Sequence, residues 1–154
     1  MVKGLVVYDT THGNTRVVAE VLAETLQQSG SKVDIFHVKD VRKVRAEEYD
    51  FLVVGSPTRF GTMSLAIRRF LGKVMASGWA GKPFVAFDTE NLANLQKAEY
   101  SAGEKIAARL REQQMNHLAP VLKALVHEMK GPLLPGEVER ARAYASDLAV
   151  LLRQ

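Results

Sequence analysis

The sequence contains no cysteine among its 154 residues. Disulfides, thiolate metal sites, iron–sulfur clusters and thiol nucleophiles are therefore excluded. Long hydrophobic runs are also absent, because stretches such as residues 51–55 fall far short of the ~18–20 residues that span a bilayer. No export signal is expected, since a short apolar run at residues 5–8 passes directly into polar residues. We therefore expect no transmembrane segment and a cytoplasmic location.

Charge of one sign is not concentrated in a dense patch. Lys and Arg number 21 against 17 Asp and Glu, which gives a net charge of +4. The densest basic stretch, residues 39–45, interleaves valines with charges and is followed by acidic residues. A solvated surface is the favoured interpretation, and no nucleic-acid partner is predicted. A weaker role in steering toward acidic partners or anionic membranes stays open.

Several signature motifs are missing as well. The sequence has neither the Gly-Lys-[Ser/Thr] ending of a Walker A loop nor the Gly-x-Gly-x-x-Gly dinucleotide fingerprint. It has no Gly-x-Ser-x-Gly nucleophile elbow, and its four histidines form no metal-binding spacing such as His-x-His. We expect no metal site and assign no catalytic residue.

What the sequence does contain is a regular alternation of apolar runs and amphipathic segments. Strands are predicted at residues 4–8, 32–38, 51–55 and 84–87, and helices at residues 14–29, 64–76, 101–114 and 137–152. Residues 40–49 are irregular or a short helix, and residues 88–100 form a long polar loop. Residues 121–129 could be strand or helix, and a strand is favoured because Gly131 and Pro132 end it.

Alternating buried strands and helices predict an α/β fold in which helices cover both faces of a parallel sheet. Hydrophobic residues make up 47% and charged residues 25%, with no internal repeat or linker, so residues 1–154 are expected to form a single domain. In such sheets ligands bind beyond the carboxyl ends of the strands. The loops after the first, third and fourth strands are therefore the candidate binding loops.

The loop after the first strand, residues 9–15, combines hydroxyl groups, a glycine and the start of a helix. Helix-start amides are unpaired donors, and the helix dipole adds partial positive charge. The hydroxyls of Thr10, Thr11 and Thr15 add donors, and Gly13 lets a ligand approach the backbone closely. The loop predicts an anion site; a helix merely capped by threonines is the alternative.

The loop after the third strand, residues 56–62, places an aromatic side chain between a proline and a glycine. Pro57 stiffens the loop, and Gly61 permits unusual backbone angles beside Phe60. Phe60 could stack on a flat ligand at the sheet edge, or it could be a core residue in a tight turn.

Together these loops resemble the flavodoxin family. The first reads Thr-Thr-x-Gly-Asn-Thr and the second, about 40 residues later, Gly-Ser-Pro-Thr-x-x-Gly. The resemblance extends to Gly131-Pro132 and Gly136-Glu137 before the closing helix. Residues 55–64 are also similar to the tryptophan-repressor-binding-protein type of NAD(P)H:quinone oxidoreductases.

The resemblance implies a flavodoxin-like three-layer sandwich, with a five-stranded parallel sheet in the order 2-1-3-4-5, and FMN as the cofactor. By position, the phosphate would be held by Thr10, Thr11, His12, Gly13, Asn14 and Thr15. The isoalloxazine ring would be bordered by Ser56, Pro57, Thr58, Arg59, Phe60 and Gly61. In this family a backbone carbonyl of the second loop often meets N5–H of the reduced flavin, and Gly61 is the best candidate here.

The third flavin loop would follow the fourth strand, where the sequence departs from the family because no glycine precedes Gly103. The candidate contacts there are Asp88, Thr89, Glu90 and Tyr100. Carboxylates at positions 88, 90 and 99 could lie near the flavin edge and lower its reduction potential, or they could be solvated loop charges. Tyr100 could stack on the ring, or it could serve as a helix-capping or packing residue.

Three functions are consistent with these observations. The short chain and compact loops favour an FMN-binding electron-transfer protein that works between redox partners. The Thr-Arg-Phe-Gly loop and the basic charge favour the alternative, a small FMN-dependent NAD(P)H:quinone oxidoreductase, so it stays open whether the protein is an enzyme. The glycine-free third loop favours a flavin-free binding module. The positive charge would steer the protein toward acidic redox partners. Compared with the quinone-oxidoreductase type, which uses a long insertion after the fourth strand to form tetramers, the chain lacks this insertion, so the resemblance implies a monomer or weak dimer.

Overall fold

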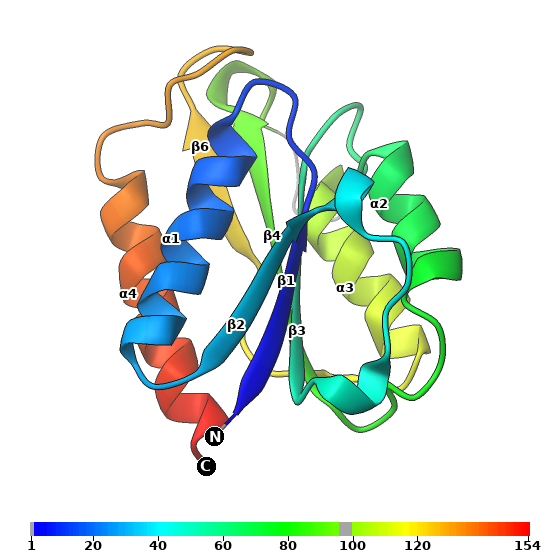
Figure 1. Ribbon diagram of the computed structural model, residues 1–154. Coiled ribbons are helices and arrows are strands. Elements are labelled where there is room, and N and C mark those ends of the chain that lie inside the picture. The colour runs from blue at the N-terminus through cyan, green and yellow to red at the C-terminus, as the bar shows by residue number, and fades with distance from the viewer. Residues whose placement is uncertain (1, 96–99) are drawn as a thin grey trace.

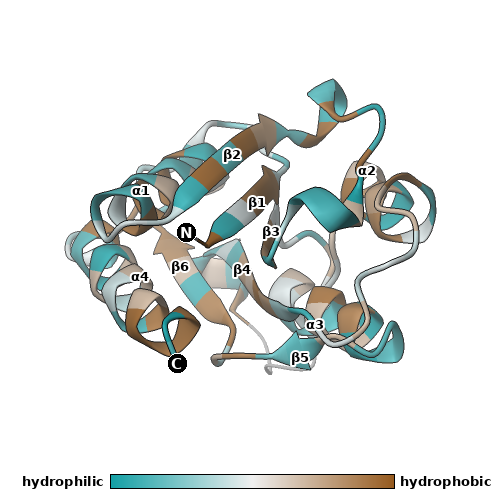
Figure 2. Cartoon of the chain, turned by 60° about the horizontal axis from the view of Figure 1, so that its bottom comes forward, coloured by the Kyte–Doolittle hydropathy of each residue, from teal (hydrophilic) through white to brown (hydrophobic). Residues whose placement is uncertain are grey.

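The described strands of the sheet all run parallel. The computed structural model describes residues 2–95 and 100–154. The strands are β1 (Lys3–Tyr8), β2 (Lys32–His37), β3 (Phe51–Pro57), β4 (Pro83–Asn91), β5 (Asn116–His117) and β6 (Leu122–Val126). β1 pairs with β2 and β3, β3 pairs with β4, and β4 pairs with both β5 and β6. β5 and β6 thus share the last edge position, and the predicted order 2-1-3-4-5 is confirmed (Figure 1 and Figure 2).

Helices cover both faces of this sheet. α1 (Asn14–Gln28) and α4 (Glu137–Leu152) lie on one side, and α2 (Leu65–Arg69) and α3 (Ala102–Glu112) lie on the other (Figure 2). Short 3₁₀ turns, η1 (Val38–Asp40), η2 (Ala46–Glu48) and η4 (Leu92–Asn94), join the larger elements. This three-layer arrangement is the one that the alternation of apolar runs predicts. No helix in the described parts of the chain is long and apolar enough to cross a membrane.

Two hydrophobic clusters form the core, one on each face of the sheet. In β1, Leu5 and Val7 join the cluster under α2 and α3, whereas Val6 and Tyr8 join the cluster under α1 and α4. Successive side chains of a strand point to opposite faces, so a strand that is apolar throughout is buried on both. The continuous apolar runs of the sequence therefore form the central strands, whose side chains are buried on both faces of the sheet.

The helix predicted at residues 64–76 is shorter than expected. Regular α-helix ends at Arg69 and continues as a π-helical turn, η3 (Phe70–Val74), in which the Met75 amide donates to the Phe70 carbonyl at 3.0 Å. A contact from another element favours the wider turn, because Gln113, the C-cap residue of α3, donates to the Leu71 carbonyl at 3.0 Å. The sequence pattern could not show this, since that donor lies 42 residues away.

Strand boundaries also differ from the prediction: β3 ends at Pro57 instead of residue 55, and the short strand β5 was not predicted. β4 runs four residues past the predicted end at 87, so the predicted loop at 88–100 is wrong for residues 88–91, and residues 96–99 of it lie outside the described part. The strand predicted at 121–129 is confined to Leu122–Val126. β4 extends because its polar residues pair with β6 in parallel register.

Candidate functional site

A cavity of about 380 Å³ opens at the carboxyl ends of the strands, at the top of the view in Figure 1. Small-molecule sites typically measure ~300–1,000 Å³. Its walls include the predicted residues Thr10, Thr11, His12, Asn14, Thr15, Pro57, Thr58, Arg59, Phe60, Gly61, Thr89 and Glu90. The structure therefore brings the three predicted loops to one place. Gly13, Ser56, Asp88 and Tyr100 are not among its described lining residues.

The loop between β1 and α1 presents backbone amides rather than capping side chains. Gly13 is the N-cap of α1, with φ +93°, and no side chain caps the helix. The hydroxyl of Thr10 instead accepts from the Gly13 amide at 3.0 Å and closes the loop. No threonine thus caps α1 at its N-cap position, and the anion site stays a prediction. The amides of Thr11, His12 and Asn14 donate no hydrogen bond to any described residue, so they are available to bind an anion.

Two residues of this loop hold it in place. Thr15 is 1% exposed, and its hydroxyl shares a 2.7 Å hydrogen bond with the Thr89 hydroxyl of β4. The Asn14 side chain donates to the Lys130 carbonyl at 3.2 Å, in the segment after β6. Both side chains therefore position the loop, and its free donors are mainly backbone amides.

The loop after β3 forms a tight turn that displays an aromatic ring. Arg59 and Thr62 exchange two backbone hydrogen bonds of 3.0 Å, and the residues between them, Phe60 and Gly61, have φ of +51° and +73°. Positive φ at both central positions is typical of a type I′ turn and is costly for an aromatic residue. The Phe60 side chain is fully exposed, at 102%, so the interpretation as a core residue is wrong.

The base of this turn is fixed by the hydroxyl groups of Ser56 and Thr58, of which Thr58 also lines the cavity. Ser56 is completely buried at the end of β3; its hydroxyl donates to the Pro57 carbonyl at 2.9 Å and accepts from the Ser64 amide at 3.0 Å. The Thr58 hydroxyl accepts from the Ala102 amide at 3.0 Å, at the start of α3. Ser56 thus stabilises the turn from within β3. The loop was predicted to begin at this residue, whereas the strand continues to Pro57.

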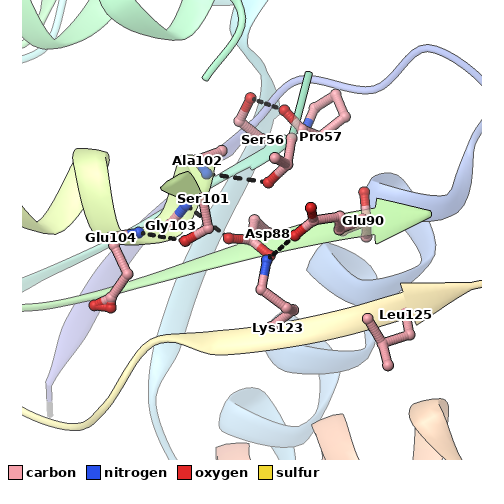
Figure 3. A network of polar contacts seen from close by, with 12 residues as sticks. Ser56, Pro57, Asp88, Glu90, Ser101, Ala102, Gly103, Glu104, Lys123 and Leu125 are labelled. Atoms are coloured by element: carbon pink, nitrogen blue, oxygen red, sulfur yellow. Dashed lines mark hydrogen bonds and ion pairs between the residues drawn. The ribbon is translucent and has the colours of Figure 1, made fainter. Parts of the chain in front are cut away.

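Asp88 and Glu90 form a buried ion cluster with Lys123 of β6 (Figure 3). The lysine Nζ lies 2.8 Å from Asp88 Oδ1 and 2.6 Å from Glu90 Oε1, and the two carboxylate side chains are 0% and 5% exposed. Burial alone would lower the pKa of Lys123, but the charges and hydrogen bonds of the two carboxylates outweigh burial and raise it. Solvated loop charges are therefore the wrong description of both carboxylates.

Asp88 also connects the cluster to α3. Its Oδ2 accepts a hydrogen bond from the Gly103 amide at 2.7 Å (Figure 3). The neighbouring amides have acceptors of their own: the Ala102 amide donates to the Thr58 hydroxyl, and the Glu104 amide donates to the Ser101 hydroxyl at 3.2 Å. Three first-turn amides of α3 are thus satisfied by side chains from three segments. Asp88 positions the helix, whereas Glu90 reaches the cavity wall.

Tyr100 lies beside the second loop without lining the cavity. A Cβ on Gly61 would lie 3.0 Å from the Tyr100 carbonyl oxygen, so the two loops touch where only glycine fits. The Tyr100 ring is 49% exposed, with the Lys105 Nζ 6.0 Å from its centre. Whether this ring contacts a ligand stays a prediction.

Sequence reasoning missed four cavity residues. They are Asn91, Asn94, Val126 and Met129. The two asparagines, three residues apart after a strand, were a usable signal for polar ligand contacts. Val126 and Met129 carried no sequence signal for a ligand contact, because their position in the cavity wall depends on the pairing of β6 with the end of β4.

The chain is a doubly wound α/β protein with a cavity at the carboxyl ends of its parallel strands, the position at which open sheets of this kind bind ligands. The flavodoxin domain family matches residues 5–119, and the chain belongs to this family. It is 39% identical over 93 residues to a flavodoxin of Aquifex aeolicus, covering 58% of this chain and 50% of that protein. A solved archaeal flavodoxin superposes with a TM-score of 0.81 at 26% identity, covering 99% of both chains.

Relatives of a second kind are also found. An NAD(P)H dehydrogenase (quinone) of Gluconacetobacter diazotrophicus is 25% identical over 170 residues, covering 95% of this chain and 82% of that protein. These matches confirm both resemblances, to flavodoxins and to quinone oxidoreductases, as similarities. The chain spans about half the length of the Aquifex flavodoxin.

Proposed function

We propose that the cavity binds FMN and that the protein transfers electrons between redox partners. The observation that carries this proposal is the pairing of an amide-lined loop with a fully exposed aromatic ring on one cavity of about 380 Å³. Family membership and the Aquifex flavodoxin support it.

The loop between β1 and α1 would hold the phosphate. A dianion placed there would accept hydrogen bonds from the unpaired amides of Thr11, His12 and Asn14. It would also lie at the positive end of the α1 dipole. Glu90, at another part of the same cavity wall, carries a carboxylate that would repel the phosphate. The charge distribution therefore favours one orientation of the cofactor.

The turn after β3 would border the flavin ring. Phe60 offers an apolar face whose exposure to water is unfavourable until a flat ligand covers it. Gly61 keeps the turn within contact of Tyr100 and retains a backbone carbonyl that can face the ring. When bound, FMN would supply the redox chemistry, and the chain would bind, orient and partly shield it.

The experiment that tests this proposal is reconstitution. The purified protein is incubated with excess FMN and desalted, and its absorption spectrum is recorded. We expect a yellow protein with a bound-flavin spectrum, and quenching of flavin fluorescence on titration. A colourless protein without quenching would leave the flavin-free binding module as the better description.

A matched pair of ligands separates phosphate binding from ring binding. Thr11→Ala removes an exposed hydroxyl at the anion loop, so we expect FMN affinity to fall by ~1–3 kcal/mol. Riboflavin lacks the phosphate, so its affinity should stay unchanged. An equal loss for both ligands, or for neither, would place the phosphate elsewhere.

The second candidate function is an FMN-dependent NAD(P)H:quinone oxidoreductase. It is favoured by the quinone dehydrogenase relative, which aligns with 95% of this chain. Addition of NADPH and a soluble quinone to the FMN-loaded protein, without any partner reductase, distinguishes the candidates. Fast turnover would support the enzyme, whereas negligible turnover supports the carrier.

A further inference from the structure

The segment between Asp50 and Asp88 contains no carboxylate side chain. It carries five basic residues: Arg59, Arg68, Arg69, Lys73 and Lys82. The Lys82 amine is used internally, since it donates to the Ala46 and Tyr49 carbonyls. The other four basic residues are exposed. The surface that this segment builds is therefore positively charged at neutral pH.

Three of these cations share one side of α2 and its π-helical continuation. Leu65, Arg68 and Arg69 follow the spacing i, i+3, i+4, so they project from the same helix face. Lys73 continues the exposed side into η3, while Ile67, Phe70 and Leu71 are buried. We call Leu65, Arg68, Arg69 and Lys73 the basic face of α2. Leu65 is 79% exposed, an unusual position for a large apolar side chain.

The surroundings do not neutralise this face. Within residues 2–95 and 100–154, no ion pair joins Arg68, Arg69 or Lys73 to a carboxylate. η1, which packs against α2, exposes both Lys39 and Asp40, whose charges cancel. Arg109 of α3 adds a further cation, with its guanidinium 3.8 Å from the position of a Cβ on Gly72.

The basic face begins at the rim of the cavity. The Arg68 guanidinium lies 3.4 Å from the Thr62 hydroxyl, and Thr62 closes the turn that displays Phe60. Phe60 and Arg59 line the cavity. A protein that exchanges electrons with a cofactor in this cavity has to approach the same rim.

We propose that the basic face of α2 docks a redox partner protein whose own electron-transfer site is surrounded by carboxylates. This inference rests on the proposed function. Opposite charges would steer the encounter and raise the association rate, and Leu65 would supply the apolar contact. A membrane surface fits the basic face of α2 less well than an acidic protein does, because helices that lie in a membrane interface bury a broad apolar side. α2 has five residues, and Leu65 is the large exposed apolar residue on this face.

The test uses two small haem proteins of opposite charge as probes: the acidic haem domain of cytochrome b5 and the basic cytochrome c. The FMN-loaded protein is reduced with dithionite without excess and mixed with either probe by stopped flow, so that one electron passes from the reduced FMN, which is oxidised, to each ferric haem, which becomes ferrous. We expect faster reduction of cytochrome b5 at low salt, and a rate that falls steeply as ionic strength rises from about 0.02 to 0.3 M.

Two double variants with the same change in net charge locate the effect. Arg68→Glu with Arg69→Glu should lower the second-order rate with cytochrome b5 at least ~10-fold at low salt. Lys32→Glu with Arg153→Glu, at exposed positions outside the face, should lower it less than ~3-fold. Arg68→Gln with Arg69→Gln, a milder change, should give an intermediate rate. An equal loss in both reversal variants, or a wild-type preference for cytochrome c, would overturn the proposal.

A binding measurement keeps this proposal separate from the cofactor assignment. Fluorescence anisotropy of labelled poly-L-glutamate is measured with the protein before FMN is added, using the same variants. Tight binding that the Arg68 and Arg69 reversals abolish supports the docking face even if FMN fails to bind. Binding to phosphatidylserine vesicles without binding to poly-L-glutamate or cytochrome b5 would assign the face to a membrane and overturn the proposal.

Discussion

At the scale of single residues, the site is built from side chains that are unfavourable in the free protein. Phe60 combines a left-handed backbone conformation with complete exposure of its ring. Asp88 and Glu90 are buried carboxylates stabilised by one lysine, and Glu90 lies in the cavity wall. Groups that are costly for folding and gather at one cavity are typical of binding sites, which is consistent with the proposed function.

Phe60→Asn should have opposite effects on folding and on binding. Asparagine tolerates positive φ, so we expect the free energy of unfolding of the flavin-free protein to rise by roughly 1 kcal/mol. FMN affinity should fall by about 2- to 10-fold, because an aromatic contact is lost. Urea unfolding and fluorescence titration measure the two effects. Phe36→Asn in β2 is the control, with no gain in stability and unchanged FMN affinity.

Lys123→Met should destabilise the protein strongly. Removal of the cation leaves two buried carboxylates without their partner, which costs about 3–5 kcal/mol. Urea unfolding at neutral pH is the measurement. Lys43→Met, at an exposed lysine, should change stability by less than about 0.5 kcal/mol. A loss as small as the control's would show that the carboxylates do not depend on Lys123.

At the scale of elements, the edge of the sheet is tied to the last helix through Glu137. Its carboxylate accepts from the Leu125 amide of β6 at 2.8 Å and from Arg140 at 2.9 Å, in the first turn of α4. The Arg140 hydrogen bond and the Leu125 amide lower the pKa of Glu137, although partial burial opposes them. Val126 and Met129 of the cavity wall lie in the segment that this contact holds.

Glu137→Gln should cost stability in a pH-dependent way. A carboxyl whose pKa is lowered by folding stabilises the protein above the unfolded value of ~4.3, and this contribution is lost as the pH falls through the folded value. We expect a loss of roughly 1–3 kcal/mol at pH 7 that is smaller at pH 3, because the contribution decreases as the pH falls below the unfolded value. Urea unfolding at both pH values checks this. Glu139→Gln, which breaks an exposed pair with Arg142, should change little.

At the scale of the whole molecule, both hydrophobic clusters share the same strands. β1 contributes alternate residues to each, as Val6 and Val7 show, so neither cluster can form without the sheet. The fluorescence of the single tryptophan, Trp79, reports the cluster under α2 and α3. Far-UV circular dichroism reports all helices and strands.

We therefore expect one cooperative unfolding transition with the same midpoint by both probes. FMN at about 100 times its dissociation constant should stabilise the protein by about 2.7 kcal/mol. Two separated transitions would contradict the prediction of one domain over residues 1–154. A coincident transition that FMN does not shift would instead count against the cofactor assignment.

The sequence by itself determined the order of the elements, the parallel sheet and the position of the first two loops. Apolar periodicity, Gly13 and Gly61 act locally, so their consequences can be inferred without the fold. Only the tertiary structure decided that Asp88, Thr89 and Glu90 lie in a buried strand rather than a loop, and that Val126 and Met129 complete the cavity. Polar residues can be buried in a strand when partners such as Lys123 and Thr15 reach them, and those partners lie 33 to 74 residues away.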